Sequence, residues 1–566
     1  MGRKAADALA VLCLAGAAGV FCLPIANPDI FWHLSAGRWM LDHLAFPRAD
    51  WLSHTMAGAP WADFEWLVQL LWVGVSRAAG ETGLWALKVL VFLAAGGILW
   101  RTLGLYGAGR APRALGIFIW AIAGASANDL RPENFSLLFF LGLWHWLEAR
   151  RLAGSSPAAG AAFRKRAAAL AALFALWANL HAGFLYGLIL LAIFAAVDAF
   201  RRRSWELAAL GAAAAAAALA NPYGVHVYLV PWEHLTAIGD LTEYIREWQE
   251  ASILQRWLWP FWTVLAAAYA AVLWRYSRHR DVPFEHVAAL AVFSLSATGH
   301  IRTAVYFVSV AVPIIAAAAG SFGLAERRPR AHRALVAAGA AAASAFFLFR
   351  FLVPLSRLEA FSNVYVPVRT ARFLAEQRET LGGRPLFNPW HWGGYLGYRL
   401  FPDYRVFVDG RYIFHPLLRP IFEAARAPES YRALMDRFGI EVAVVQRTGQ
   451  FLRVPVDLRD GGAEQLMRPY FLFFLPRKDW ALVHWDDQGL VFVRRSAFGE
   501  EWLSAHEYRY FRPDDLTAAY LMVREGFAAY EAVAGEVERY IAGAGEAGEA
   551  RAARQWLESV AKAAGR

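Results

Sequence analysis

Apolar stretches long enough to cross a bilayer recur along the first 353 residues of the chain and then stop. About 20 residues of α-helix, with a range of about 17–25, span the hydrocarbon core of a membrane. The pattern therefore predicts a polytopic α-helical membrane domain over residues 1–353. Its eleven expected spans lie at 6–26, 83–101, 112–128, 135–150, 166–181, 183–200, 205–220, 257–275, 284–299, 303–323 and 334–353.

Two apolar blocks have more than one interpretation. Residues 6–26 follow Arg3 and Lys4 as in a cleavable signal peptide, but the ten spans behind them favour a retained signal-anchor. Residues 64–80 either span the membrane or lie flat at its interface. If they lie flat, the loops on the side of the N-terminus hold 20 Lys and Arg against 7 on the other side. Because basic loops stay in the cytoplasm, we expect the flat arrangement.

This orientation predicts a bacterial-type inner (plasma) membrane protein with a cytoplasmic N-terminus and an extracytoplasmic C-terminal part. That part is expected to form an α/β domain over 354–510 and a helical tail over 511–566, which breaks at 543–548. Alternating apolar positions predict its strands, and 3.6-residue periodicity its helices. The expected elements are helices near 367–380 and 429–438, strands at 383–388, 404–410 and 441–447, and a hairpin over 479–495 that turns at 487–489.

Composition agrees with a membrane protein. Of the 566 residues, 58% are hydrophobic and 18% are charged, whereas a soluble chain has roughly 25% charged residues. So much apolar surface excludes a disordered, collagen-like or coiled-coil chain. The net charge of +10 comes from short clusters between apolar blocks, which indicates membrane orientation and not nucleic-acid binding. The two cysteines, Cys13 and Cys22, lie in one apolar block, so no disulfide framework is expected.

The predicted orientation places most of the conspicuous polar residues at the outer membrane face. Ionisable residues at membrane depth are costly and mark functional sites more often than not. The candidates are Asp29, His33, Asp63 and Glu65 in the first outside loop (27–82), Asp129, Arg131 and Glu133 in the second, His181 in the third, Arg246 in the fourth, His300 and Arg302 in the fifth, and Lys88 near the outer end of the second span.

These residue types suit one particular chemistry. A carboxylate can act as general base for an acceptor hydroxyl, and arginine and histidine can hold the phosphate of a lipid-linked sugar. No Walker-type phosphate loop occurs, which argues against an ATP-driven pump. Each candidate also has a structural interpretation: Asp29 as a helix cap, Arg131 with its acidic neighbours as a local ion pair, and Lys88 as a snorkelling side chain.

The layout resembles that of the GT-C-type glycosyltransferases, which include protein mannosyltransferases, aminoarabinose transferases and oligosaccharyltransferases. The likeness rests on an acid directly after the first span (Asp29), a long first outside loop, a second acidic site (Asp129 or Glu133) and a C-terminal outside domain. It implies inverting sugar transfer from a polyprenyl-phosphate (or pyrophosphate) donor to a protein, lipid or glycan acceptor, with these three acids as catalytic residues and the other candidates binding substrate. Many members have two adjacent acids where Asp29 is followed by Ile30, so a second acid would come from Asp63 or Glu65.

The resemblance extends to acceptor and metal sites. In the tail, Trp390, His391, Trp392 and Asp409 loosely resemble the acceptor-reading W-W-D-Y-G region of oligosaccharyltransferases. The spacing of histidines predicts no metal site, but the oligosaccharyltransferase branch leaves open a divalent cation, Mg²⁺ or Mn²⁺, between Asp29 and Asp129 or Glu133. Two other functions compete: a lipid or glycolipid flippase or transporter, and a non-catalytic membrane scaffold that displays the outside domain.

Overall fold

The computed structural model describes residues 3–154, 159–236, 242–321, 360–457, 461–543 and 547–563, and within 322–359 only residues 334, 338, 339 and 341. The chain divides into two compact units. The first comprises Met1–Ala49 and Pro60–Tyr365, and the second comprises Asp50–Ala59 and Val366–Arg566. A segment of the first outside loop therefore folds with the C-terminal unit, which the sequence pattern did not indicate.

Helices make up the described part of the first unit. Each predicted span up to residue 323 coincides with a helix, whereas the span expected at 334–353 lies outside the described stretches. The helices are α1 (Arg3–Phe21), α2 (Asp29–His43), α3 (Trp66–Leu105), α4 (Arg110–Ala123), α5 (Glu133–Leu152), α6 (Gly160–Ala178), α7 (Phe184–Arg202), α8 (Glu206–Ala217), α9 (His226–Thr236), α11 (Trp259–His279), α12 (Phe284–Gly299) and α13 (Ala304–Ser321), with short 3₁₀ turns η1 (Ala125–Ala127), η2 (Arg246–Trp248), η3 (Arg256–Leu258) and η4 (Ile301–Thr303).

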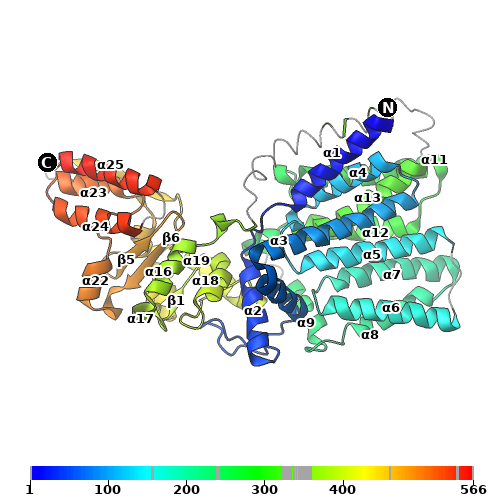
Figure 1. Cartoon of the computed structure of the whole chain (residues 1–566), viewed down its shortest axis with the longest axis horizontal. Helices are drawn as coiled ribbons and strands as arrows, with labels where there is room; N and C mark the ends of the chain where they lie inside the picture. The colour runs from blue at the N-terminus through cyan, green and yellow to red at the C-terminus, as the bar shows by residue number, and fades with distance from the viewer. Residues whose placement is uncertain are drawn as a thin grey trace. The chain divides into compact units, whose positions relative to one another are not determined.

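Within the described residues, four helical stretches are long and apolar enough to cross a membrane: Trp66–Leu105, Phe184–Arg202, Arg256–His279 and Ile301–Gly320. Several other helices are shorter or carry charged residues toward one end, so the predicted number of eleven spans stays a prediction. Figure 1 shows α5, α7, α12 and α13 running alongside one another. In the window of Ile301–Gly320, 78% of residues are buried inside the protein, against 22–39% in the other three. Helix α13 is therefore central in the bundle.

A glycine breaks the longest helix where the sequence predicts a boundary. Gly80 of α3 has φ 60° and ψ −153°, a conformation that side chains with a Cβ rarely adopt. The segment before Gly80 and the segment after it are consequently two helices joined by a kink. The kink lies between the block expected to be flat (64–80) and the span expected at 83–101.

The second unit has a four-stranded sheet in the order β1-β2-β6-β5 and a separate hairpin, β3–β4. Strands β1 and β2 are parallel and the other neighbours are antiparallel. The strands are β1 (Leu386–Phe387), β2 (Val442–Gln446), β3 (Phe451–Asp457), β4 (Ala463–Pro469), β5 (Trp480–Trp485) and β6 (Gly489–Arg494). Its longer helices are α16 (Val368–Glu376), α18 (Gly393–Leu400), α19 (His415–Ala424), α20 (Pro428–Arg437), α22 (Glu500–His506), α23 (Leu516–Arg524), α24 (Tyr530–Gly543) and α25 (Ala547–Ala563); short α17 (Arg378–Leu381) and α21 (Phe471–Phe474) complete the set.

These elements confirm most predictions for the tail, including the strands at 383–388 and 441–447 and the 479–495 hairpin. The strand expected at 404–410 is wrong, because only Val406 pairs there, in an isolated bridge with Ser53. The side chain of Asn388 takes two of the backbone bonds that a strand partner would need, accepting from Phe407 N–H (2.8 Å) and donating to Val408 C=O (2.8 Å). The hairpin β3–β4 was not predicted.

The segment 50–59 is held in the second unit by polar contacts. His54 Nε2 lies 2.8 Å from the carbonyl of Leu386. Arg411 Nη2 lies 2.7 Å from Asp50 Oδ1 and 2.8 Å from Asp409 Oδ2, and these ionic side chains are 1% exposed or less. The segment thus contributes one carboxylate to a buried ionic triad. In the same unit, the backbone at Gly393 packs closely against the chain at Val408, since a Cβ at Gly393 would lie 1.8 Å from the Val408 carbonyl oxygen.

Candidate active site

Most of the predicted site residues of the first unit lie in the connections at one end of its helix bundle. These connections follow α1 and precede α3, α5, α7, α11 and α13. The connections before α5, α7 and α13 are short, whereas the two longer ones, before α3 and α11, contain the helices α2 and α9. Side chains from five separate connections therefore meet in one polar cluster, whose members are Asp29, His33, Asp63, Glu65, Arg131, Glu133, His181, Glu247 and Arg302.

Two arginines and two glutamates form one half of the cluster. Arg131 Nη1 donates to Glu247 Oε2 at 2.6 Å, and its Nη2 bonds the other oxygen of the same carboxylate. Arg302 Nη1 lies 4.0 Å from Glu247 Oε2, and Arg302 Nε lies 3.9 Å from Glu133 Oε2. Burial opposes ionisation of the Glu247 carboxyl, but Arg131 and Arg302 outweigh it and hold its pKa at about 2. Glu247 is therefore anionic at any physiological pH.

Glu65 forms the other half, between two imidazoles. Its Oε2 lies 3.9 Å from His33 Nδ1, and its Oε1 lies 3.8 Å from His181 Nε2. Burial, with the nearby charge of Asp63, raises the pKa of Glu65 to about 8. Burial also lowers the pKa of His181 to about 3, helped by Arg302 and Arg131, and lowers that of His33 well below its usual value. At neutral pH the structure favours a protonated carboxyl between two neutral imidazoles.

Hydrogen bonds fix the orientation of both imidazoles. Gly183 N–H donates to His181 Nδ1 at 3.0 Å, so His181 Nε2 carries the hydrogen and faces Glu65. The hydroxyl of Ser136 is 2.9 Å from the same Nδ1. On the other side, Gln69 Nε2 lies 3.3 Å from His33 Nδ1 and donates to Asp63 Oδ1 at 2.7 Å.

The two aspartates of the expected catalytic set have different surroundings. Asp29 is the first residue of α2, is half-buried, and its charge acts on both Glu65 and Arg131. Asp129 accepts the N–H of Ala26 through both oxygens (3.2 and 3.0 Å) and the N–H of Leu130 at 2.7 Å. Asp129 thereby ties the connection before α5 to the chain that follows α1, while Asp29 faces the ionisable groups.

No protein-family model and no curated protein matches the chain in sequence. Among solved structures, the apo oligosaccharyltransferase of Archaeoglobus fulgidus is 11% identical, with a TM-score of 0.52 over 93% of this chain and 84% of that chain. The fold is of the GT-C type. Two further structures score lower: the same enzyme tethered to an acceptor peptide with the NVT sequon (TM-score 0.49, 12% identity, 93% and 83% covered) and ArnT from Cupriavidus metallidurans bound to undecaprenyl phosphate (TM-score 0.46, 15% identity, 88% and 100% covered).

The resemblance to GT-C-type enzymes is thus confirmed for the fold, and the four long apolar helical stretches of the described residues support a membrane location. Three other candidates of the first unit make contacts of their own. Lys88 is fully buried in α3 and donates to the carbonyl of Leu23. Arg246 is exposed, with its guanidinium 5.4 Å from the ring centre of Trp257. His300 Nδ1 lies 3.0 Å from the carbonyl of Trp248.

The acceptor-side candidates lie in the second unit. Trp390, His391 and Trp392 form the 3₁₀ turn η6 (Trp390–Trp392). His391 is exposed and Trp390 is half-buried, whereas Trp392 is buried. Asp409 is fully buried in its salt bridge with Arg411, so its carboxylate does not reach the surface.

Sequence reasoning did not single out Glu247 or Gln69. Glu247 is the acidic neighbour of the candidate Arg246 in the same predicted outside loop, and that location was the available signal. Gln69 begins the second turn of α3 and has no charge to mark it. Both act by holding other side chains, which becomes visible only when the connections are packed together.

The expected divalent cation finds no matching donor set in this arrangement. Asp129 uses its oxygens on backbone N–H groups, and Glu133 faces the guanidinium of Arg302. Across the described stretches, no three His, Cys, Asp or Glu side chains are grouped closely enough to hold a metal ion.

Proposed function

We propose that this protein is an integral membrane glycosyltransferase that moves a sugar from a polyprenyl-phosphate donor to an extracytoplasmic acceptor. The observation that carries the proposal is a convergence of side chains at one end of a GT-C-type helix bundle. Arg131 and Arg302 lie there together with Glu65 and its two histidines, His33 and His181. Arginine side chains at the ends of apolar helices can bind the phosphate of a lipid, and the ionisable groups beside them can bind the sugar attached to that phosphate. The eleven spans, the cytoplasmic N-terminus and the inner-membrane location belong to this proposal.

The leaving group explains the arginines. When the acceptor oxygen bonds to the anomeric carbon, the bond from that carbon to the phosphate oxygen breaks, and the lipid phosphate takes the bonding electrons. The phosphate needs cationic stabilisation more than a proton, and donors positioned in advance supply it without reorganisation. Arg302 provides this charge, since 35% of its side chain is exposed, and Arg131 supports it from a more buried position (16%).

The acceptor hydroxyl must lose a proton, and Asp29 is the proposed base. It lies at the N-terminus of α2, where the helix dipole stabilises a carboxylate. Its charge acts on Arg131, so the base belongs to the same cluster as the phosphate-binding cations. Attack from the side of Asp29, opposite the departing phosphate, inverts the anomeric centre.

Glu65 has a different role in this scheme. With a pKa of about 8, its carboxyl is mostly protonated at neutral pH and donates a hydrogen bond instead of accepting a proton. We assign it to a hydroxyl or phosphate oxygen of the donor, with His33 and His181 holding it in place. Asp29 and Glu65 are then two acids whose surroundings give them opposite protonation states.

The experiment is a transfer assay with purified protein and a polyprenyl-phosphate sugar, using two arginine variants. Arg302→Ala should lower kcat and raise KM for the donor together, because it removes charge from both the bound donor and the leaving phosphate. Arg256→Ala is the matched control: Arg256 is an exposed arginine in another predicted outside loop and is not one of the candidate substrate-binding residues. Equal activity of the two variants would remove Arg302 from the phosphate site, and no transfer by the wild-type protein with any lipid-linked sugar would overturn the proposed function.

A further inference from the structure

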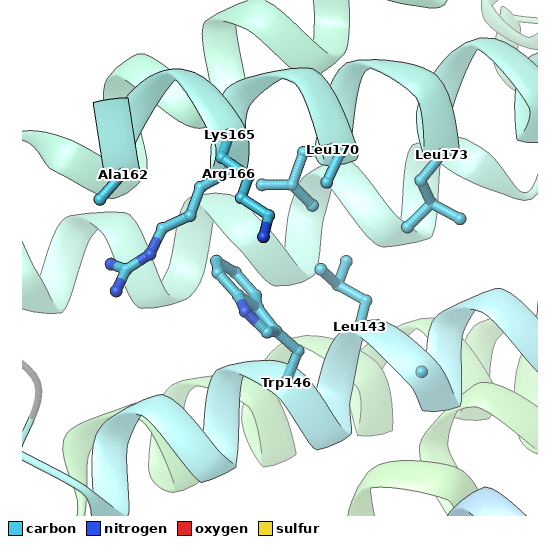
Figure 2. Close-up of a pocket in the computed structure, with 9 residues that line it drawn as sticks. Leu143, Trp146, Ala162, Lys165, Arg166, Leu170 and Leu173 are labelled. Atoms are coloured by element: carbon cyan, nitrogen blue, oxygen red, sulfur yellow. The ribbon is translucent and has the colours of Figure 1, made fainter. Parts of the chain in front are cut away.

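A second candidate binding site lies far from the polar cluster. A groove of about 430 Å³ runs between α5 and α6, within the size range of pockets that bind small molecules (about 300–1,000 Å³). Its walls are apolar, with Leu143 and Trp146 on α5 and Leu170 and Leu173 on α6 (Figure 2). Trp146 lies thirteen residues after Glu133 in α5, about 20 Å at 1.5 Å per residue. The groove is therefore separate from the proposed active site.

Two cations lie at one end of this apolar groove. Figure 2 shows Lys165 and Arg166 on α6, with the Lys165 amine facing the ring of Trp146 across the gap. Arg166 Nη1 donates to Glu206 Oε1 at 2.7 Å, and the other oxygen of Glu206 accepts from Arg150 at 3.0 Å. Lys165 is exposed, and no carboxylate of the described residues pairs with it. The groove thus combines an apolar wall with an uncompensated positive charge at its end.

We infer that this groove binds an anionic phospholipid of the surrounding bilayer. One acyl chain lies along Leu143, Leu170 and Leu173, and the headgroup phosphate lies at Lys165 and Arg166. Basic pockets between membrane helices on the cytoplasmic side bind anionic lipid headgroups, and a tryptophan at headgroup level is typical of such an interface. The basic loop between α5 and α6 is predicted to be cytoplasmic, so the lipid comes from the cytoplasmic leaflet.

Native mass spectrometry of the purified full chain tests the headgroup contact, with phosphatidylglycerol or phosphatidylcholine added to the detergent. We expect phosphatidylglycerol to bind more tightly than phosphatidylcholine. Lys165→Gln should weaken phosphatidylglycerol binding about fivefold, the factor expected for one cation near a lipid surface. Arg164→Gln is the matched control, since it removes the neighbouring exposed cation that does not line the groove.

A second pair of variants tests the acyl-chain contact without changing charge. Ala169 lines the groove, whereas Ala168 is exposed on α6 and does not line it. We expect Ala169→Trp to abolish the phosphatidylglycerol adduct and Ala168→Trp to leave it intact. Equal binding of the two lipids, equal effects within either pair of variants, or displacement of phosphatidylglycerol by equimolar polyprenyl phosphate would each overturn the inference.

Discussion

Arg131 and Glu247 are 116 residues apart in the chain, yet the guanidinium bonds both carboxylate oxygens, one of them at 2.6 Å from Nη1. A bidentate pair fixes the plane of the guanidinium as well as its position. The same carboxylate lies 4.0 Å from Arg302 Nη1, so one glutamate orients both cations of the proposed phosphate site. Glu247 is thus a positioning residue for the arginines.

Replacing Glu247 should consequently impair the reaction. A hydrogen bond to a charged group contributes about 1.5–3 kcal/mol, so we expect Glu247→Gln to lower kcat/KM for the donor roughly 10- to 100-fold. Transfer kinetics with a polyprenyl-phosphate sugar measure this loss. Glu250→Gln, an exposed acid in the same loop, should have wild-type kinetics. Unchanged kinetics of Glu247→Gln would show that the arginines do not depend on this contact.

The proposed base makes a second prediction. Asp29→Asn keeps the shape of the side chain but cannot accept the acceptor proton, and loss of general-base catalysis typically costs about 10²–10⁴ in rate. We expect kcat to fall by that factor while donor binding changes little. Asp42→Asn removes an exposed acid from the same helix and serves as the control. Full activity of Asp29→Asn would transfer the role of base to another acid of the cluster.

Glu65 makes a prediction about pH. Because its pKa is raised to about 8, the protonated form predominates at pH 7, and deprotonation above pH 8 adds a negative charge beside Asp63, Asp29 and Glu133. That charge repels the donor phosphate, so kcat/KM of the wild-type protein should fall as pH rises through about 8.

The isosteric variant Glu65→Gln tests whether Glu65 causes this decline of kcat/KM at alkaline pH. Glu65→Gln resembles the protonated carboxyl, so it should keep most of its activity at pH 7 and lose the alkaline decline. Glu247→Gln should keep that decline, because the pKa of Glu247 is about 2 and the residue does not titrate in this range. An unchanged alkaline decline in Glu65→Gln would assign it to another group.

Much of the membrane unit could be predicted because a bilayer demands long apolar helices, and their connections at one face must lie near one another. For that reason Asp29, Asp129 or Glu133, His181 and Arg302 could be grouped from the sequence before any contact was known. The contacts themselves could not be predicted, since Arg131 meets Glu247 only through the packing of helices far apart in the chain.

Local patterns failed where tertiary contacts replace regular structure. The apolar alternation of 404–410 reads as a strand, but Asn388 and the segment 50–59 take its backbone bonds. Asp409 resembles part of an acceptor-reading motif, and only the position of Arg411 shows that its carboxylate is buried in a salt bridge. Lys88 has two interpretations in the sequence, a snorkelling side chain or a substrate-binding cation, and the structure shows its amine donating to the carbonyl of Leu23.

Membrane orientation can be tested by labelling single cysteines. Ser430 is exposed on α20 in the part of the chain predicted to be extracytoplasmic. Ser430→Cys should react with a membrane-impermeant thiol reagent in intact spheroplasts. Ser277→Cys, at an exposed position in the last turn of α11 and on the side predicted to be cytoplasmic, should react only after lysis. The reverse pattern would invert the orientation of the whole chain, and the wild-type protein measures labelling of Cys13 and Cys22.

The buried triad of the second unit makes a prediction about stability. Arg411 bridges Asp50 and Asp409, whose side chains are both fully buried, so Arg411→Met leaves two buried carboxylates without their cation. Breaking a buried ion pair in this way costs about 3–5 kcal/mol, and thermal unfolding of the purified chain should show a lower Tm. Arg399→Met, an exposed arginine of α18, should unfold like the wild-type protein.

A compensated variant separates buried charge from lost packing. Replacing both acids as well, in Asp50→Asn/Asp409→Asn/Arg411→Met, removes every charge of the triad, and a fully neutral core can be as stable as an ionic one. We expect this triple variant to recover most of the Tm lost in Arg411→Met. If it unfolds as early as the single variant, the hydrogen bonds of Arg411, and not its charge, hold the 50–59 segment in the second unit.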